Sequence, residues 1–231
     1  FAERGGDPKK PGKEDPLDAL VWLAQRDGEP GWPSPFGSGR PGWHIECCAI
    51  ALHYLNPATT DEYAIDIQGG GNDLIFPHHE MSAAQSRSMR NQKFARTYVH
   101  AGMIGLNGQK MSKSLGNLVF VSKLIASGVN PAAIRWALMG HHYADDLMWS
   151  DEIIQIAEKE IEELQLCLAR MEVAPTDSVI QEIIESLSKN LDTPRAISAI
   201  RTWMKETDLG KTGGVAGELG RALDTLLGIA L

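Results

Sequence analysis

The spacing of apolar and polar positions divides this chain into parts with different periods. Residues 32–145 hold short apolar runs that predict strands and helices in turn, which is the pattern of an α/β layer. Residues 146–231 repeat apolar positions with a helical period throughout, which predicts a helical bundle. Residues 1–31 are rich in Gly, Pro and charge and are expected to connect to the α/β layer, with one short helix from Pro16 to Gln25.

Within the α/β layer, the apolar spacing of residues 43–55 predicts a helix, and the face expected to be apolar holds Ile45, Ala49 and Leu52. The alternating, β-branched run from Tyr63 to Gln68 predicts a strand, and Pro77 is expected to open the next helix. Further strands are predicted within 94–103 and 118–121, with a hairpin turn at Asn107-Gly108. Short helices are expected at 122–126 and at 132–139, and Asn130-Pro131 is expected to start the second of them.

In the bundle, four helices are predicted at 151–171, 177–189, 193–206 and 214–227. Ser150 is a plausible N-cap for the first of them. Its expected apolar stripe, interpreted as helix packing, holds Ile153, Ile156, Ile161 and Leu164.

Composition narrows the possible partners. With 231 residues, 43% of them apolar, the chain can bury a core, and its net charge of -8 disfavours broad attraction to nucleic acid. No apolar run is long enough to cross a bilayer, so no membrane partner is expected. Three cysteines, two of them adjacent, form no disulfide framework, which predicts a reducing compartment, the cytoplasm. The chain opens on Phe1 rather than Met, and we expect a fragment of a longer protein.

Cys47 and His78 are candidate metal ligands, because thiolate and imidazole both bind zinc. A zinc site needs about four donors, and the position one turn after His78 is Ser82, a poor ligand. On spacing alone the alternative stays open that Cys47 is a small buried apolar residue and His78 a residue at a helix start. His79 is not expected to share a metal with His78, because neighbouring helical residues point in different directions.

Two further segments have the composition of a nucleotide site. Lys110 and Lys113 lie in a loop with small hydroxyl residues, which suits a clamp on a polyphosphate, although solvated basic loops are common. The glycine run 69–71 follows a strand and is typical of close backbone approach to a ligand, or of a tight turn. Asp73, just beyond it, could bind an ammonium group or accept a proton.

Three strings together resemble cysteinyl-tRNA synthetase, a class I aminoacyl-tRNA synthetase: GRPGWHIEC at 39–47, DIQGGGNDLIFPHHE at 66–80 and KMSKSLGN at 110–117. The likeness covers at least residues 16–150, in the family's order, and KMSKS is the second signature of that class. It implies that the α/β layer is the second half of a Rossmann-like catalytic domain, followed by an all-α bundle.

Other features resemble more closely a paralogous family, the cysteine:glucosaminyl-inositol ligases of mycothiol biosynthesis. FAERGGDP at 1–8 and YVHAGMIGLNGQKMSKSLGNLVFVSKL at 98–124 are similar to these ligases. Ser82 stands where the synthetase has a glutamate zinc ligand, which the ligases lack. The chain also ends at Leu231, after the bundle, where a synthetase would continue into an anticodon-reading domain.

The resemblance implies roles for individual residues. Cys47 and His78 would bind one zinc ion together with a cysteine from the family's N-terminal half. The residues expected to contact the substrate or the adenylate are Trp43, Gly71, Asn72, Asp73 and Ile104. The ATP-binding loop would hold Lys110, Met111, Ser112, Lys113 and Ser114, with Mg²⁺ accompanying ATP. Catalytic roles fall to Lys110, Lys113 and Asp73, whereas Trp43 could equally be a core aromatic residue.

The activity implied is that of an ATP-dependent ligase. It would activate L-cysteine as cysteinyl-AMP with loss of pyrophosphate, and the amine of glucosaminyl-inositol would then attack to form an amide. The HIGH motif and the third zinc ligand of the family are not in these residues, so activity is expected only together with the N-terminal half of the same protein. We expect a monomer without a nucleic-acid partner. A cysteinyl-tRNA synthetase and an inactive binding fragment remain the alternatives.

Overall fold

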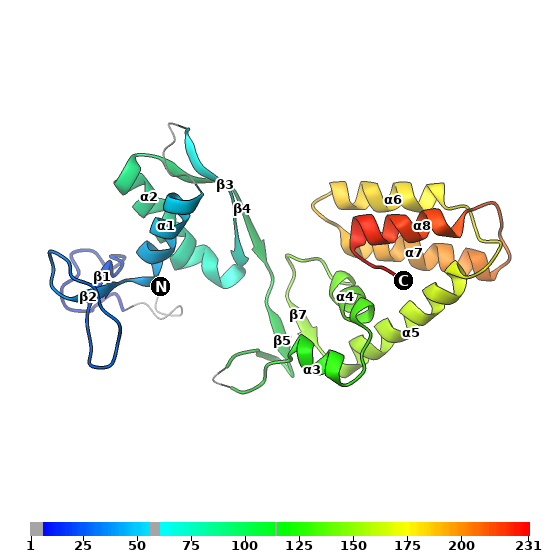
Figure 1. The fold of residues 1–231 in the computed structure, drawn as a ribbon, viewed down its shortest axis with the longest axis horizontal. Coiled ribbons are helices and arrows are strands. Elements are labelled where there is room, and N and C mark those ends of the chain that lie inside the picture. Colours follow the sequence, from blue (N-terminus) through cyan, green and yellow to red (C-terminus); the bar gives the residue numbers. More distant parts are fainter. Residues whose placement is uncertain (1–6, 56–60, 114) are drawn as a thin grey trace. The chain divides into compact units, whose positions relative to one another are not determined.

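The computed structural model describes residues 7–55, 61–113 and 115–231 and forms two compact units, Phe1–Ala101 and Gly102–Leu231 (Figure 1). Most of the FAERGGDP string, residues 1–6, lies outside the described residues. Ser114 of the expected ATP-binding loop also lies outside them. The expected division of the chain into a connector (1–31), an α/β layer (32–145) and a helical bundle (146–231) remains a prediction. No helix in the described part of the chain combines the length and the apolar character that crossing a membrane requires.

The first unit is built around a parallel pair of strands. β3 (Tyr63–Gly71) runs beside β4 (Lys93–Ala101), in register from Tyr63 opposite Lys93 to Gly71 opposite Ala101. Parallel strands need a long crossover, which here consists of the 3₁₀ turn η2 (Asn72–Leu74), the π turn η3 (Ile75–His79) and the helix α2 (Glu80–Arg90). This βαβ unit confirms the predicted strands, and it places the glycine run at the carboxyl end of β3.

Helix α1 (Trp43–Tyr54) packs against α2 and confirms the predicted helix. Of the expected apolar face, Leu52 is buried but Ala49 is exposed, and the other buried residue of the helix is Cys48. The helix is turned so that the Cys48 thiol reaches α2, where Sγ donates to the carbonyl oxygen of Ser82 at 3.4 Å. The small core of this unit holds Cys48, Leu52, Ala64, Phe94 and Ala95.

The predicted helix from Pro16 to Gln25 is wrong. Asp15 and Asp18 accept hydrogen bonds from the backbone N–H groups of residues 14, 15 and 17, and these bonds fix turns at residues 14–18. Beyond these turns the chain forms β1 (Trp22–Ala24), which pairs antiparallel with β2 (Gly39–Pro41). The pairing of β1 with β2, about fifteen residues further along the chain, therefore outweighed the local preference for a helix.

The second unit begins with a three-stranded sheet in the order β6-β5-β7. β5 (Ile104–Leu106) and β6 (Gln109–Lys110) form the predicted hairpin, and Asn107 and Gly108 in its turn have φ angles of 53° and 76°. Positive φ at both central residues is what a two-residue hairpin turn requires. β7 (Leu147–Trp149) runs parallel to β5 on its other side.

Two short helices follow the hairpin. The strand predicted at 118–121 is wrong. Residues 117–120 have no regular structure, and the helix α3 (Val121–Ala126) begins at Val121. α4 (Pro131–Met139) begins as predicted, since the Asn130 side chain accepts a hydrogen bond from the N–H of Ala132 at 2.9 Å. Trp136 of α4 is fully buried and joins this part of the chain to the core of the bundle.

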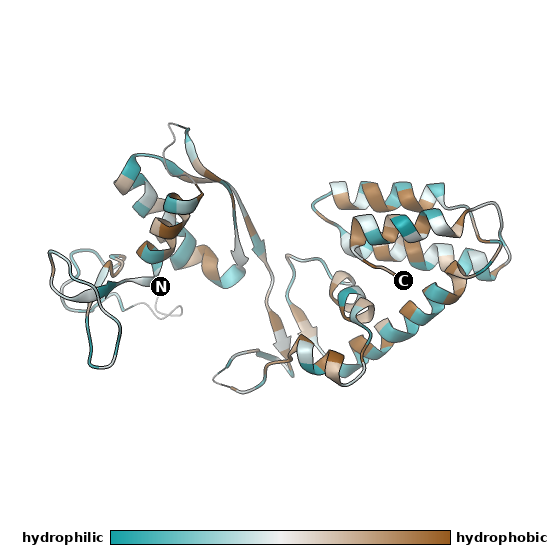
Figure 2. Ribbon diagram, in the orientation of Figure 1, coloured by the Kyte–Doolittle hydropathy of each residue, from teal (hydrophilic) through white to brown (hydrophobic). Residues whose placement is uncertain are grey.

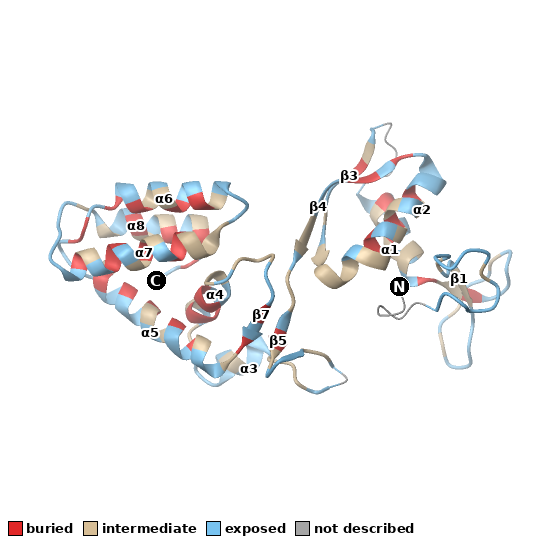
Figure 3. Ribbon diagram, turned by 180° about the vertical axis from the view of Figure 1, so that it is seen from behind, coloured by how far each residue is buried: buried red, intermediate tan, exposed pale blue. Residues whose placement is uncertain are grey.

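All four predicted bundle helices are present: α5 (Asp151–Leu168), α6 (Asp177–Ser188), α7 (Thr193–Asp208) and α8 (Ala216–Ala222), which continues into the π turn η4 (Leu223–Leu227). Ser150 caps α5 by accepting from the N–H of Ile153 at 3.4 Å, as predicted. The stripe of α5 was predicted wrongly at Ile156, which is exposed. Brown and teal alternate along these helices in Figure 2, and the buried positions of Figure 3 follow the same spacing.

Candidate active site

The carboxyl ends of β3 and β4 bring the glycine run and a group of histidines together. In parallel α/β sheets this end of the strands is where ligands bind. Gly70 lies opposite His100 in the register, and Asn72 and Asp73 follow at once in η2. A Cβ atom on Gly70 would lie 2.9 Å from Cε1 of His79, so the glycine is needed for this imidazole to pack against the strand.

His79 is almost fully buried and joins two neighbouring side chains. Its Nε2 lies 3.0 Å from Nε2 of Gln68, and its Nδ1 lies 2.7 Å from Nε2 of His100. An amide nitrogen can only donate, so Nε2 of His79 accepts, and the neutral ring carries its proton on Nδ1 and donates to His100. Burial, followed by the neighbouring His100 and His78, lowers the pKa of His79, which favours this neutral form.

His78 is buried on the other side of the same turn and contacts the start of α1. Its Nδ1 lies 2.9 Å from Nδ1 of His44. The ring of Trp43 stacks on it, with the centroids 4.4 Å apart and the planes at 24°. Burial lowers the pKa of His78, and burial, then the neighbouring His78, lowers the pKa of His44. Both rings are therefore neutral near pH 7, the form in which imidazole binds a metal.

Ser82 is committed to the backbone of its own helix. The residue is almost fully buried, and its hydroxyl donates to the carbonyl oxygen of His78 at 2.9 Å. The hydroxyl thus closes the first turn of α2 beneath His78, which agrees with its unsuitability as a metal ligand.

Cys47 lies one helical turn after Trp43 and His44, the two residues that contact His78. Residues three and four apart share a helix face, so the Cys47 thiol belongs to the face that faces His78. Burial, followed by the charge of Glu46, raises the pKa of Cys47, so the free side chain is a thiol. The donor set, one half-buried thiol and one neutral imidazole, fits zinc in kind, because zinc binding displaces the thiol proton.

These two donors do not by themselves make a site. Among the residues that the structure describes, no group of three or more His, Cys, Asp or Glu side chains is arranged to hold a metal ion. A zinc ion at Cys47 and His78 would therefore need a further ligand from outside the described residues.

The lysine loop lies in the second unit and begins at Lys110, the last residue of β6. Lys110 and Lys113 are both exposed, whereas Met111 between them packs against the core. Asn117 fixes the base of the loop: its Oδ1 accepts from the N–H of Ser112 at 2.8 Å, and its Nδ2 donates to the carbonyl oxygen of Lys110 at 3.2 Å. The loop is thus anchored at Met111 and Asn117, with its lysine side chains on the surface. Ile104, at the start of β5, is 38% exposed.

Residues 2–159 match the family model of the tRNA synthetases class I (C) catalytic domain.

The chain belongs to this family.

Curated proteins from several species that are similar to this chain share one name, L-cysteine:1D-myo-inositol 2-amino-2-deoxy-alpha-D-glucopyranoside ligase. The chain is 49% identical to the protein of Gordonia bronchialis, 52% to that of Rhodococcus jostii and 47% to that of Streptomyces coelicolor. Each alignment covers the whole chain but only 55%, 55% and 56% of the relative, so the chain spans about half the length of these proteins. The resemblance to these ligases that the motifs predicted is confirmed.

The fold also matches a solved synthetase. LeuRS from Agrobacterium radiobacter K84, in a ternary complex with tRNA and LeuAMS, superposes with a TM-score of 0.60 over 90% of this chain and 35% of LeuRS. The sequences are only 16% identical, so the match concerns the fold alone. The predicted class I synthetase-like α/β fold is confirmed.

In this synthetase-family domain, the sequence did not single out Gln68, His44 or His100. His44 precedes Cys47 by three residues on one helix face, and this spacing could have indicated it. His100 and Gln68 lie at the carboxyl ends of the two parallel strands, which the rule for ligand sites in α/β sheets could have indicated.

Proposed function

We propose that this chain is part of an ATP-dependent ligase that activates L-cysteine as cysteinyl-AMP and transfers the cysteinyl group to the amine of glucosaminyl-inositol. The observation that carries the proposal is the 47–52% identity, over the whole chain, to proteins named as ligases of these two substrates. Because the chain spans about half of those proteins, the activity is assigned to the full-length protein that contains it, with its N-terminal half as the necessary partner.

In the first step a carboxylate oxygen of cysteine attacks the α-phosphorus of ATP. The bond to the bridging oxygen breaks, and pyrophosphate leaves. The exposed Lys110 and Lys113 neutralise the charge that grows on the phosphate oxygens, and Mg²⁺ accompanies the nucleotide. Ser112 and Met111 shape the loop that presents these lysines, and Ser114 completes the motif in the sequence.

The adenylate would lie at the carboxyl ends of β3 and β4. Gly71 and Asn72 bring backbone close to it, and Asp73 binds the ammonium group of cysteine. In the second step the amine nitrogen of the acceptor attacks the acyl carbon. The bond to AMP breaks, and the nitrogen loses a proton, for which Asp73 is a candidate acceptor.

Zinc would be held by Cys47, His78 and a cysteine of the N-terminal half. When bound, it supplies a soft acceptor for the thiolate of the substrate, which selects cysteine over serine by ligand type. Trp43 and His44 support this site by fixing the imidazole ring of His78.

Transfer to tRNA is the second candidate, since the family model is that of a tRNA synthetase. The charge of the bundle argues against it, because residues 150–231 hold fifteen Asp and Glu but only eight Lys and Arg. An acidic surface repels a polyanion, whereas it places no such limit on a small amino sugar.

The test uses the full-length protein with ATP, cysteine and either glucosaminyl-inositol or tRNA(Cys). We expect AMP and the amide with the amino sugar, and no charging of tRNA; efficient tRNA charging would reject the ligase. Lys113→Ala should slow cysteine-dependent pyrophosphate exchange by about 10²–10³-fold. Lys123→Ala is the matched control, because this lysine lies over the ring of Phe120 at 5.2 Å in α3, outside the loop.

A further inference from the structure

Residues 7–42, which we call the ribbon segment, have no core of their own. Gly39 and Gly42 are the only buried residues among them. The core of this unit takes its side chains from α1, β3 and β4 and none from the ribbon segment. The only helix or strand structure of the ribbon segment is the two-stranded pair β1-β2. An isolated pair of strands is marginally stable in water.

The ribbon segment nevertheless exposes large apolar side chains. Those side chains are Leu17, Leu20, Val21, Trp32 and Phe36, with exposed fractions from 44% to 82%. Around β1 the ribbon in Figure 3 is largely pale blue. Three of them, Leu17, Leu20 and Val21, line one groove together, and apolar side chains that gather in this way mark an interaction surface.

A groove continues this surface onto α2. It has a volume of 590 Å³ and lies between residues 10–21 and α2, whose Met81 and Ala84 line it beside Leu17 and Leu20. Gln85 of α2 also lines the groove, and its Oε1 is buried without a hydrogen-bond partner in the described part of the chain. The indole N–H of Trp22 in β1 is likewise buried without a hydrogen-bond partner in the described part of the chain. Such groups are normally paired in a complete protein, and a polypeptide backbone offers both a donor and an acceptor.

We propose that the apolar surface formed by the ribbon segment and the outer side of α2 is the docking surface for the polypeptide that precedes residue 1 in the full-length protein. The inference rests on the proposed function, which assigns an N-terminal half to that protein. The relatives are nearly twice as long as this chain. The ribbon segment is the part of the chain that adjoins the preceding polypeptide in sequence, and short connections favour neighbours in space.

The first test compares labelling of an introduced thiol in this chain alone and in the full-length protein. Leu20→Cys tests the surface, and Leu209→Cys, at an 83% exposed position in the bundle, is the control. Labelling is followed by mass spectrometry of the peptide concerned, so the three native cysteines do not interfere. In the full-length protein the maleimide rate at Leu20→Cys should fall at least about tenfold relative to the control. Equal relative rates in the two proteins would overturn the proposal.

A second substitution guards against a label that perturbs the surface. Leu20→Asp should lower the melting temperature of the full-length protein more than that of this chain, in which the residue is 44% exposed. Leu209→Asp should be neutral in both. If this chain forms a dimer that protects Leu20→Cys as well as the full-length protein does, a second copy is the occupant and the proposal is wrong.

The outcome is separable from that of the proposed function. Protection of Leu20→Cys in a full-length protein without ligase activity keeps the docking surface and rejects the function. Ligase activity in a protein that leaves Leu20→Cys fully reactive keeps the function and rejects the docking surface.

Discussion

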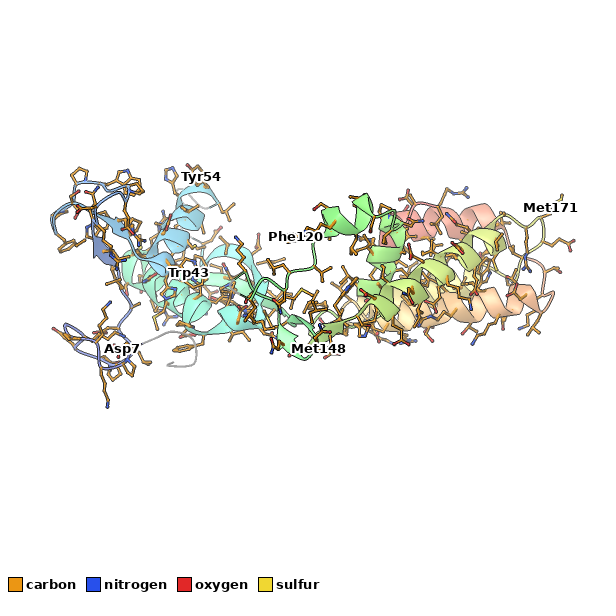
Figure 4. The ribbon with its side chains drawn as sticks, turned by 90° about the horizontal axis from the view of Figure 1, so that it is seen from below. Asp7, Trp43, Tyr54, Phe120, Met148 and Met171 are labelled. Carbon is orange, nitrogen blue, oxygen red and sulfur yellow. The ribbon has the colours of Figure 1, made fainter. Side chains whose placement is uncertain are left out.

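The indole ring of Trp43 lies on the imidazole ring of His78, although 35 residues separate them in the sequence, and 59% of the tryptophan remains exposed. Figure 4 labels Trp43 among the side chains of the first unit. A buried core tryptophan would be covered on both faces. Trp43 instead covers the imidazole with one face and leaves other parts of its ring in solvent, as a residue that lines a binding site does.

Removal of the Trp43 ring should affect substrate binding more than folding. If the exposed part of the ring contributes about 1 kcal/mol to cysteine binding, Trp43→Ala in the full-length protein should raise KM for cysteine about fivefold. Because the ring is 59% exposed, its loss should change the melting temperature little. Trp43→Phe should recover part of the loss. Tyr54→Ala, at a 74% exposed aromatic residue of the same helix, is the control. Equal KM values for the Trp43→Ala and Tyr54→Ala variants would contradict the role of Trp43.

The adjacent cysteines should differ in metal binding. Cys48 is fully buried, and burial raises its pKa to about 11, so this thiol serves packing and a hydrogen bond to Ser82. We expect Cys47→Ala to abolish zinc binding in the full-length protein and Cys48→Ala to retain it, measured by metal analysis of freshly purified protein. Retention of zinc by Cys47→Ala would remove the proposed site.

Position 70 should not tolerate a side chain, whereas position 69 should tolerate one. A Cβ atom at Gly70 would meet His79 at 2.9 Å and Leu74 at 3.0 Å, but the nearest atom to a Cβ at Gly69 is 4.0 Å away. Gly70→Ala should destabilise the protein by about 1–3 kcal/mol and disturb the imidazole signals of His79 and His100 in NMR spectra. Gly69→Ala is the control. Similar unfolding free energies and spectra for the two variants would show that the ring of His79 can move aside.

A partly buried ion pair should make the bundle sensitive to acid. Both carboxylate oxygens of Glu160 accept from Arg201, at 2.7 and 2.8 Å, and Oε2 also accepts from the indole N–H of Trp136 at 2.6 Å. Burial raises the pKa of Glu160, but the hydrogen bonds from Arg201 and Trp136 and the charge of Arg201 outweigh it, so the pKa is lowered overall.

A carboxyl group with a lowered pKa in the folded state stabilises the fold above its unfolded pKa, near 4.3, and loses that contribution as the pH falls through its folded value. At pH 7, Glu160→Gln should cost about 1–2 kcal/mol in urea unfolding. The difference from the native protein should shrink below about pH 4. Glu163→Gln, in an exposed pair with Lys159 at 3.7 Å, should change stability by less than about 0.5 kcal/mol. A pH-independent cost for Glu160→Gln would contradict the linkage.

The sequence by itself determined the features that depend on neighbours within one or two turns of chain. The Asn107-Gly108 hairpin, the caps at Asn130 and Ser150 and the four bundle helices follow from local backbone preferences. The motifs likewise identified the candidate ligands Cys47 and His78 and the lysine loop, because residue type and spacing are visible in one dimension.

Only the tertiary structure decided which of these groups meet. The contact of His44 with His78 spans 34 residues, and the chain from Gln68 through His79 to His100 joins two strands and a turn. The choice of Cys48 over Ala49 for the buried face of α1, and of strand over helix at 22–24, also depended on partners far along the sequence. Local patterns limit what each segment can form, but the packing of one segment on another fixes its rotation and therefore the direction of each side chain.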